Sequence, residues 1–269
     1  MSQEFKHKDR YHMDDLLAIM EILRGENGCP WDREQDHHSI RKNFLEETYE
    51  VLEAIDNEDP KLLREELGDV LLQVVFHARM EEEEGRFNFD DVANDICQKL
   101  IIRHPHIFGD IKVKDSDQVL VNWDKIKQAT KGQKTATETL QNVPKVLPAL
   151  MRSAKVQQRA ARAGFDYDDV AGALSELKSE IAELEQAIAL GETLHCREEM
   201  GDVFFAAVNV SRFLDVDAEE CLGEATEKFI RRFAVVEALA EENGVDMKKA
   251  DLESLDGLWK EAKAKLSNG

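Results

Sequence analysis

The sequence predicts an all-α protein that contains two copies of one helical-bundle unit. Apolar residues recur at helical spacing, as at Leu16, Met20 and Leu23. No run of alternating β-branched residues indicates a strand, and only five prolines interrupt the 269-residue chain. The hexapeptide EELGDV at Glu65–Val70 returns as EEMGDV at Glu198–Val203, each time before an apolar stretch, which indicates an internal repeat.

Helical spacing continues along both halves of the chain. The segment DNEDP at Asp56–Pro60 separates two helical stretches, and Leu190–Gly191 separates two others. Connections this short favour antiparallel helix hairpins. The apolar faces in these hairpins comprise Leu45, Tyr49, Leu52 and Ile55 in the first half, and Ile181, Leu184 and Ile188 in the second.

A polar stretch rich in threonine and lysine divides the chain. It covers Gln128–Pro148, ends in two prolines and is typical of a linker. We therefore expect an N-terminal helical domain at residues 1–127, a linker at 128–148 and a C-terminal helical domain at 149–269. A further loop is expected at Gly109–Gln118.

The two halves share an ordered set of motifs, which indicates duplication. Each half has four acidic residues with the same spacing, and each member of the second set follows its counterpart by 133 residues. Chance similarity between acidic helices explains one such match but not the series. The sets are Glu47, Glu50, Glu66 and Asp69, then Glu180, Glu183, Glu199 and Asp202; the other repeated motifs are GCPWD and AGFDY (28–32 and 163–167), Lys99/Arg103 and Lys228/Arg232, and Trp123/Lys127 and Trp259/Lys263.

The composition restricts the class of partner. Acidic residues outnumber basic ones by 56 to 35, and the formal net charge is −21. Such a charge disfavours nucleic acid and anionic membrane surfaces as partners. The four cysteines form no C-x-x-C pair, the N-terminus does not resemble a signal peptide, and no apolar run approaches the ~20 residues that span a bilayer. We expect a cytoplasmic protein.

The repeated acids predict a metal site. Residues three apart on a helix share a face, so Glu180 and Glu183 point together, and Glu199 and Asp202 do the same. Folding of the hairpin brings the two pairs face to face, where their charges repel and lose hydration. A cation relieves this repulsion, and carboxylate ligands select Mg²⁺ or Mn²⁺.

A glycine precedes the aspartate in both copies. A glycine within a helix costs about 1 kcal/mol relative to alanine. We expect Gly68 and Gly201 to mark a close approach of the facing helix or of a ligand. The apolar residues that follow each aspartate are expected to lie in the core.

Basic and aromatic residues near the C-terminus are candidates for nucleotide contacts. Lys228, Arg231 and Arg232 suit phosphate groups, although a solvated basic strip is the alternative. Trp259 could stack on a base with Lys263 one turn further on, and helix packing is the competing role. His195 lies one turn before Glu199 and is expected to point towards the acids, whereas His37 and His38 are expected to be solvated.

The motifs taken together resemble those of the MazG nucleoside triphosphate pyrophosphohydrolases. The resemblance extends from about Leu16 to Lys263 and contains two ordered motif sets. It implies an all-α fold, Mg²⁺-dependent hydrolysis of NTPs or dNTPs to the monophosphate and diphosphate, and assembly as a homodimer. The motifs are GCPWD, EETYE, EELGDV, RHPHIF, PALMRSAKVQQRAARAGFD, EEMGDV and EKFIRRF.

The resemblance also implies roles for single residues. The second copy would be catalytic and the first mainly structural, with Glu180, Glu183, Glu199 and Asp202 binding Mg²⁺. Glu176 and His195 occupy places where the family commonly has a basic residue, which bears on phosphate affinity and substrate preference. The nucleotide-binding set would be Glu176, His195, Glu198, Lys228, Arg231, Arg232, Trp259 and Lys263.

Two other functions compete with this hypothesis. A di-iron site uses E-x-x-H pairs, but here the residue three after each first glutamate is acidic, which disfavours iron. A nucleotide-binding or regulatory scaffold without turnover is the alternative from another class. The preferred nucleotide is not indicated by any residue, although the family suggests a broad, house-cleaning range.

Overall fold

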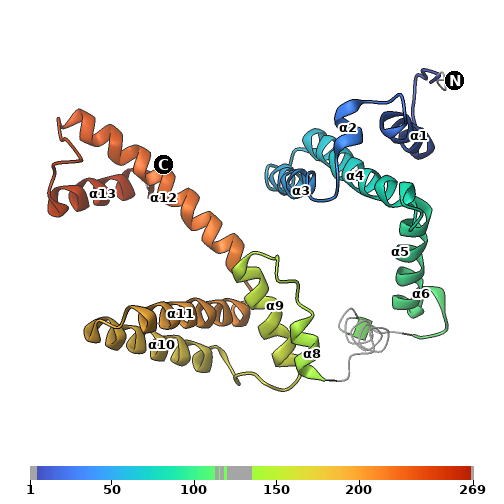
Figure 1. The fold of residues 1–269 in the computed structure, drawn as a ribbon. Helices are drawn as coiled ribbons and strands as arrows, with labels where there is room; N and C mark the ends of the chain where they lie inside the picture. Colours follow the sequence, from blue (N-terminus) through green and yellow to red (C-terminus); the bar gives the residue numbers. More distant parts are fainter. Residues whose placement is uncertain (1–4, 113–114, 116–117, 120–134, 268–269) are drawn as a thin grey trace. The chain divides into compact units, whose positions relative to one another are not determined.

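The protein consists of helices joined by turns and loops (Figure 1). The computed structural model describes residues 5–112, 115, 118–119 and 135–267. No strand occurs among these residues, which confirms the predicted all-α class. The chain divides into two compact units, Met1–Thr130 and Lys131–Gly269, each with its own hydrophobic core. Within the described ranges, no helix combines the length and apolar character that crossing a membrane requires.

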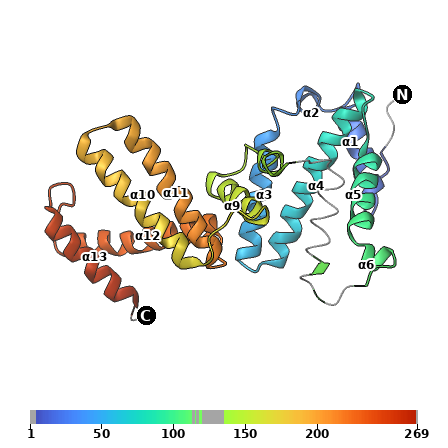
Figure 2. The same ribbon diagram turned by 90° about the horizontal axis from the view of Figure 1, so that it is seen from below.

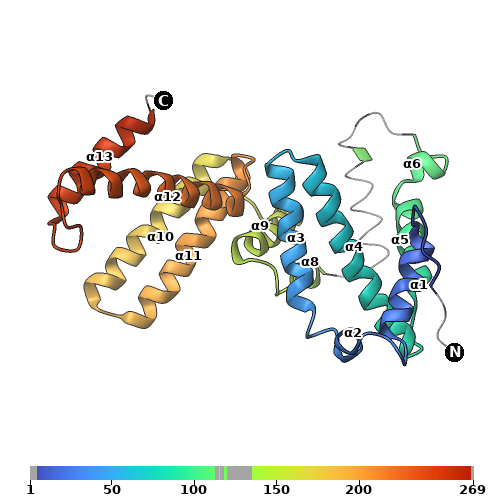
Figure 3. The same cartoon turned by 90° about the horizontal axis from the view of Figure 1, so that it is seen from above.

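The first unit is built around an antiparallel hairpin of α3 and α4 (Figure 3). The turn between them ends where the Asp59 carboxylate accepts hydrogen bonds from the backbone N–H groups of Lys61 and Leu62, with Pro60 at the first position of α4. The predicted hairpin is therefore confirmed. The helices of this unit are α1 (Met13–Arg24), α2 (Pro30–Glu34), α3 (Arg41–Asp56), α4 (Pro60–Glu83), α5 (Phe89–Arg103) and α6 (Pro105–Phe108).

The core of the first unit lies between α1 and the C-terminal half of α4. Burial of apolar side chains here confirms the predicted face of α1. The core role predicted for the stretch after Asp69 is confirmed for Val75 and Phe76 but not for Leu71, which is 38% exposed. Arg24 adds a polar contact between α1 and α4. Its guanidinium donates to the Glu83 carboxylate and lies 5.2 Å from the centre of the Phe76 ring. The buried residues are Met20, Ile40, Val75, Phe76 and Met80.

The second unit repeats the hairpin and adds another. Gly191 ends α10 in the left-handed conformation, with φ of 73°, and α11 starts two residues later, which confirms the predicted turn. Helices α10 and α11 lie side by side in Figures 1 and 2. Helices α12 and α13 form a second hairpin with a separate apolar core. The helices are α8 (Ala136–Gln141), α9 (Ala149–Arg162), α10 (Val170–Leu190), α11 (Thr193–Phe213), α12 (Ala218–Glu242) and α13 (Leu252–Ser267).

The segment predicted as a linker contains a short helix. Thr135 is the N-cap of helix α8, and its hydroxyl and backbone form a capping box with Glu138. It contacts α9, where Arg159 donates to the Thr139 carbonyl oxygen. This end of the segment therefore packs with the second unit. The cap and the contact with α9 stabilise a helix here, although the polar composition of the segment is typical of a loop. The repeated pair Trp123 and Lys127 lies outside the described residues.

Some apolar faces predicted by spacing are exposed. Leu45, Tyr49 and Ile55 share a face of α3, as predicted, yet each is more than half exposed. Phe204 and Phe205 on α11 are 58% and 44% exposed, so the core role expected for the stretch after Asp202 is wrong for these two residues. Helical spacing predicts which residues share a face of a helix. Whether that face is buried depends on the other elements that pack against it.

A histidine pair joins the loop before α3 to α4. The Nδ1 atoms of His37 and His77 lie 2.7 Å apart, and His37 Nε2 lies 2.6 Å from Glu81 Oε1. His38 is exposed as expected. The His37 side chain is 40% exposed and in addition has two partners on α4, which the sequence did not indicate. Burial, and then the nearby His37, lower the pKa of His77 below its ordinary value of 6.5.

The histidine pair predicts an acid-sensitive contribution to stability. Because the pKa of His77 is lower in the folded state, the unfolded state binds more protons once the pH falls below 6.5. The free energy of unfolding should therefore decrease from pH 6.5 towards pH 5, by up to about 1.4 kcal/mol per pH unit from this group. Urea unfolding of the H77Q variant should show a shallower decrease. The matched control H38Q should keep the wild-type slope; an unchanged slope in H77Q contradicts the assignment.

Candidate metal and nucleotide site

Three of the four acids in the second copy converge. Glu180 comes from α10, and Glu199 and Asp202 come from α11. One carboxylate oxygen from each lies within 4.8 Å of those of the other two, an arrangement that could hold a metal ion. Glu199 is buried, Glu180 is half-buried and Asp202 is exposed, so the cluster is open on one side. Glu183 lies outside this group and accepts a long 3.4 Å hydrogen bond from the Ser179 hydroxyl.

Burial and mutual repulsion make this cluster unfavourable without a cation. Burial has the largest effect on Glu180 and raises the pKa of its carboxyl, and the charges of Glu183, Asp202, Glu176 and Glu199 raise it further. A raised pKa in the folded state means that stability is greatest at acid pH and is lost as Glu180 ionises. A bound divalent cation would reverse this effect at neutral pH.

His195 contributes a positive charge beside the cluster. Its Nε2 lies 2.7 Å from Glu199 Oε1, one turn further along α11, and its Nδ1 lies 3.2 Å from Glu192 Oε2. The hydrogen bond to Glu192, together with the smaller effect of Glu199, raises the pKa of His195 and favours the imidazolium. His195 therefore points towards the acids, as the sequence indicated.

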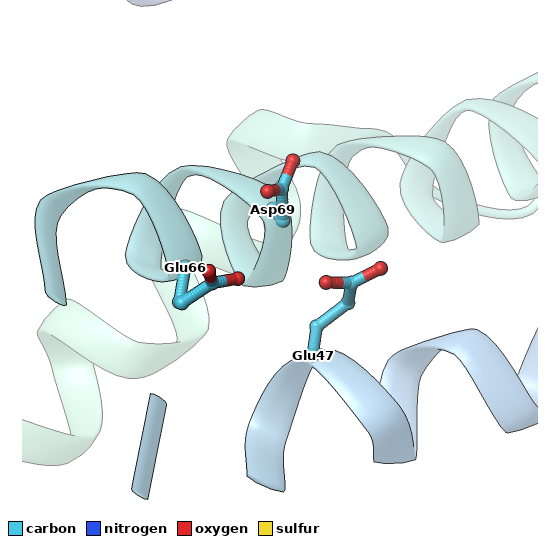
Figure 4. A group of neighbouring side chains, drawn as sticks. All are labelled: Glu47, Glu66 and Asp69. Carbon is cyan, nitrogen blue, oxygen red and sulfur yellow. The ribbon is translucent and has the colours of Figure 1, made fainter. Parts of the chain in front are cut away.

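The first copy has the same arrangement. Figure 4 shows Glu47 on α3 facing Glu66 and Asp69 on α4, and one oxygen from each lies within 4.8 Å of the others. Burial and the neighbouring carboxylates, including that of Glu50, raise the pKa values of Glu47 and Glu66. Each hairpin thus brings together the same three of its four repeated acids.

The repeated glycines do not mark a close helix approach. A Cβ atom added to Gly68 or Gly201 would meet no described atom within 4 Å beyond the residue's own helix. The expectation that the facing helix approaches at this point is therefore wrong. Both glycines are exposed. The alternative expectation, a close approach of a ligand, stays a prediction.

The basic and aromatic candidates lie on the α12–α13 hairpin. Lys228 and Arg231 are exposed on α12, and within the described residues no ion pair joins them to the acids of α10 and α11. Trp259 packs against the core of this hairpin, with its ring centre 5.2 Å from that of Phe229. Within one chain the tryptophan therefore has the helix-packing role that the sequence left open.

A cavity of about 380 Å³ lies beside the acidic cluster. Glu180 and Asp202 line it together with polar and aromatic residues from α9, α11 and the loop before α10. Sequence reasoning missed its polar residues, Gln157, Asn209 and Arg212, because none belongs to a repeated motif. Two sequence signals lay near it: the AGFDY motif, since Phe165 and Tyr167 line the cavity, and the family motif PALMRSAKVQQRAARAGFD, which contains Gln157.

Comparison with protein families agrees with this geometry. A family model described as the MazG nucleotide pyrophosphohydrolase domain matches residues 35–108 and 169–237, and each range contains one acidic set. The chain belongs to the MazG family. As a member of this family, the protein is a hydrolase. The two matched ranges correspond to the two acidic hairpins.

Curated relatives extend the match to nearly the whole chain. The nucleoside triphosphate pyrophosphohydrolase of Escherichia coli K12 is 46% identical over 93% of this chain and 97% of its own length. The nucleoside triphosphate pyrophosphohydrolase/pyrophosphatase MazG of Thermotoga maritima is 41% identical over 93% and 95%. The uncharacterized protein YabN of Bacillus subtilis is 46% identical over 94% of this chain but only 52% of its own length, so it is a longer relative.

Cation binding should be measurable as thermal stabilisation. Millimolar Mg²⁺ should raise the melting temperature, because a ligand that binds the folded state at 100 times its Kd contributes about 2.7 kcal/mol. The E180Q variant should melt higher than wild type in chelator, since one repelling charge is gone, and should gain less from Mg²⁺. The E47Q/E180Q variant should gain least.

E185Q, which removes an exposed carboxylate of α10 outside the cluster, is the matched control and should respond to Mg²⁺ as wild type does. An equal Mg²⁺ response in E47Q/E180Q and wild type is incompatible with cation binding at these clusters.

Proposed function

We propose that this enzyme is a Mg²⁺-dependent nucleoside triphosphate pyrophosphohydrolase, with Mn²⁺ able to replace Mg²⁺. It would convert NTPs and dNTPs to the monophosphate and diphosphate, with the broad range that the resemblance implies. The convergence of Glu180, Glu199 and Asp202 carries the proposal, because an all-oxygen cluster suits a hard divalent cation. MazG membership and the names of the E. coli and T. maritima relatives support the same reaction.

The three converging acids would hold the ion. When bound, Mg²⁺ would neutralise phosphate charge and increase the acidity of a coordinated water. The oxygen of a water would attack the α-phosphorus, the bond from that phosphorus to the bridging oxygen would break, and diphosphate would leave. The water's proton would pass to a carboxylate of the site.

Glu183 is our candidate for that carboxylate. It lies outside the group of converging oxygens, yet it is near enough for its charge to raise the pKa of Glu180. A carboxylate that is beside the ligands but not among them is suited to accept a proton through a water molecule. Glu180 is favoured less as the proton acceptor because it belongs to the converging group.

Charge complementarity supports the phosphate-binding roles. The imidazolium favoured at His195 would supply a positive charge beside Glu199, at a place where related chains commonly have a lysine. The basic residues of α12 would provide further phosphate contacts. We propose the same nucleotide-binding set as the sequence indicated: Glu176, His195, Glu198, Lys228, Arg231, Arg232, Trp259 and Lys263.

A homodimer would complete this site. The basic residues of α12 form no ion pair with the acids of their own chain among the described residues, so a second copy is our proposed source of these contacts. Exposed apolar side chains on both helices of the acidic hairpin support an interface, including Ile181, Ile188 and Phe204. We also propose a cytoplasmic location, where the four free cysteines would stay reduced, and neither nucleic acid nor membrane as a partner.

Product analysis tests the reaction and the active copy. ATP or dGTP with Mg²⁺ should yield the monophosphate and diphosphate. E199Q should reduce kcat about 100-fold or more, whereas E66Q, the same change in the first copy, should retain activity. Nucleoside diphosphate with phosphate as products would contradict attack at the α-phosphorus. Absence of any product would favour the non-catalytic scaffold, and loss of activity in E66Q alone would reverse the assignment of the active copy.

The role of Glu183 can be separated from metal binding. E183Q should lower kcat about 100-fold, which is within the range for loss of a general base. Its melting temperature should still rise with Mg²⁺ as in wild type, because the converging oxygens are retained. E185Q again serves as the control. If E183Q loses the Mg²⁺ response, Glu183 is a ligand and not the base.

A further inference from the structure

The segment between α9 and α10 forms one wall of the cavity beside the acids. This segment, residues 163–169, is called the α9–α10 connection below. Three of its residues line the cavity, whose wall also includes Glu180 and Asp202 of the acidic hairpin. The position of the connection therefore affects the shape of the space next to the proposed metal site.

Arg212 of α11 holds the connection by an ion pair. Its Nη2 donates to Oδ1 of Asp166, and the two side chains are only 21% and 28% exposed. Its Nε and Nη2 also donate to Oδ1 of Asn209, at 3.1 and 2.9 Å. The guanidinium carbon lies 4.5 Å from the centre of the Phe213 ring. Together these contacts fix the planar guanidinium in one orientation.

Asp166 extends this constraint to the next residue of the connection. The oxygen that accepts from Arg212 also accepts the backbone N–H of Tyr167 at 2.9 Å. The Tyr167 hydroxyl is hydrogen-bonded to Glu176 on α10. The side chain also lies against Gly172, where an added Cβ would be 3.3 Å from the Tyr167 Cβ. The connection is therefore joined to α11 at one residue and to α10 at the next.

The first copy provides a comparison at the equivalent position. Arg79 precedes Arg212 by 133 residues, which is the separation of the repeated acids. Its guanidinium pairs with Glu82 and Glu83 at 3.0 and 3.2 Å, and both partners lie on its own helix, α4. The second copy uses the equivalent arginine to hold the segment that precedes its acidic hairpin.

A cation in the wall of a nucleotide site either contacts a phosphate group or positions other residues. Nε and Nη2 of Arg212 already donate to acceptors of the protein, and its charge is paired with that of Asp166. A phosphate bound through these atoms would displace Asp166 and leave its carboxylate without its charged partner. The contacts therefore favour a positioning role.

We propose that Arg212 is a positioning residue, which acts through Asp166 and Tyr167 to hold the α9–α10 connection against the acidic hairpin. The inference rests on the proposed function. Loss of the ion pair loosens one wall of the cavity and weakens substrate binding. The converging acids keep their arrangement, because α10 and α11 contact each other directly.

Steady-state kinetics of D166N and R212M separate this role from phosphate contact. D166N keeps the arginine and removes the charge of its partner. Both variants should raise KM for ATP about three- to fivefold, the effect of losing a partly exposed ion pair, with kcat within about twofold of wild type. The double variant D166N/R212M should be no worse than either single change, since both remove the same contact.

R79M, the same change at the equivalent position of the first copy, is the matched control and should keep the wild-type KM. If R212M raises KM while D166N lowers it or leaves it unchanged, Arg212 contacts the substrate directly and the proposal is wrong. An unchanged KM in both variants also overturns it.

Hydrogen exchange without nucleotide tests the positioning independently of turnover. The amides of Gly164 and Phe165 donate to carbonyl oxygens of α9, and they should exchange about three- to fivefold faster in D166N and R212M than in wild type or R79M. Unchanged exchange in both variants contradicts the proposal whether or not the enzyme is active. Absence of ATP hydrolysis by wild type, with faster exchange in these variants, sinks the proposed function and keeps the positioning of the connection by Arg212.

Discussion

Repulsion between carboxylates held close together is the constraint on which the arrangement of this protein depends. Each acidic hairpin brings oxygens of two glutamates and an aspartate within 4.8 Å of one another. Their charges and partial burial raise pKa values in both copies. The turns at Pro60 and Gly191 keep the facing helices in register despite this repulsion. A fold that maintains an unfavourable cluster twice is suited to a cation that compensates it.

The second unit carries its converging acids and its exposed basic residues on different helices. Helices α10 and α11 supply the acids, and together with α9 and the loop before α10 they also line the cavity next to them. The α12–α13 hairpin has its own core and presents basic residues on an exposed surface. The converging acids and the exposed basic residues therefore come from different helices.

Local features of the fold could be predicted from sequence, and packing features could not. The hairpins, their turns and the pairing of the acids followed from helical spacing and from Pro60 and Gly191. The expected approach of the facing helix at Gly68 and Gly201 and the core role expected for Phe204 were wrong, because each depended on what lies opposite the residue. The contacts of His37 were missed for the same reason: its partners are 40 and 44 residues away on α4.

The sequence by itself determined that two acidic hairpins exist and which residues share their inner faces, because a helix repeats every 3.6 residues and a short turn reverses it. Only the tertiary structure decided that Glu180, Glu199 and Asp202 converge while Glu183 lies outside them. It also decided that Gln157 is buried, with a hydrogen bond to the carbonyl oxygen of a residue 48 positions away. Such contacts depend on how α9 packs across α11, and no local pattern in the sequence records that packing.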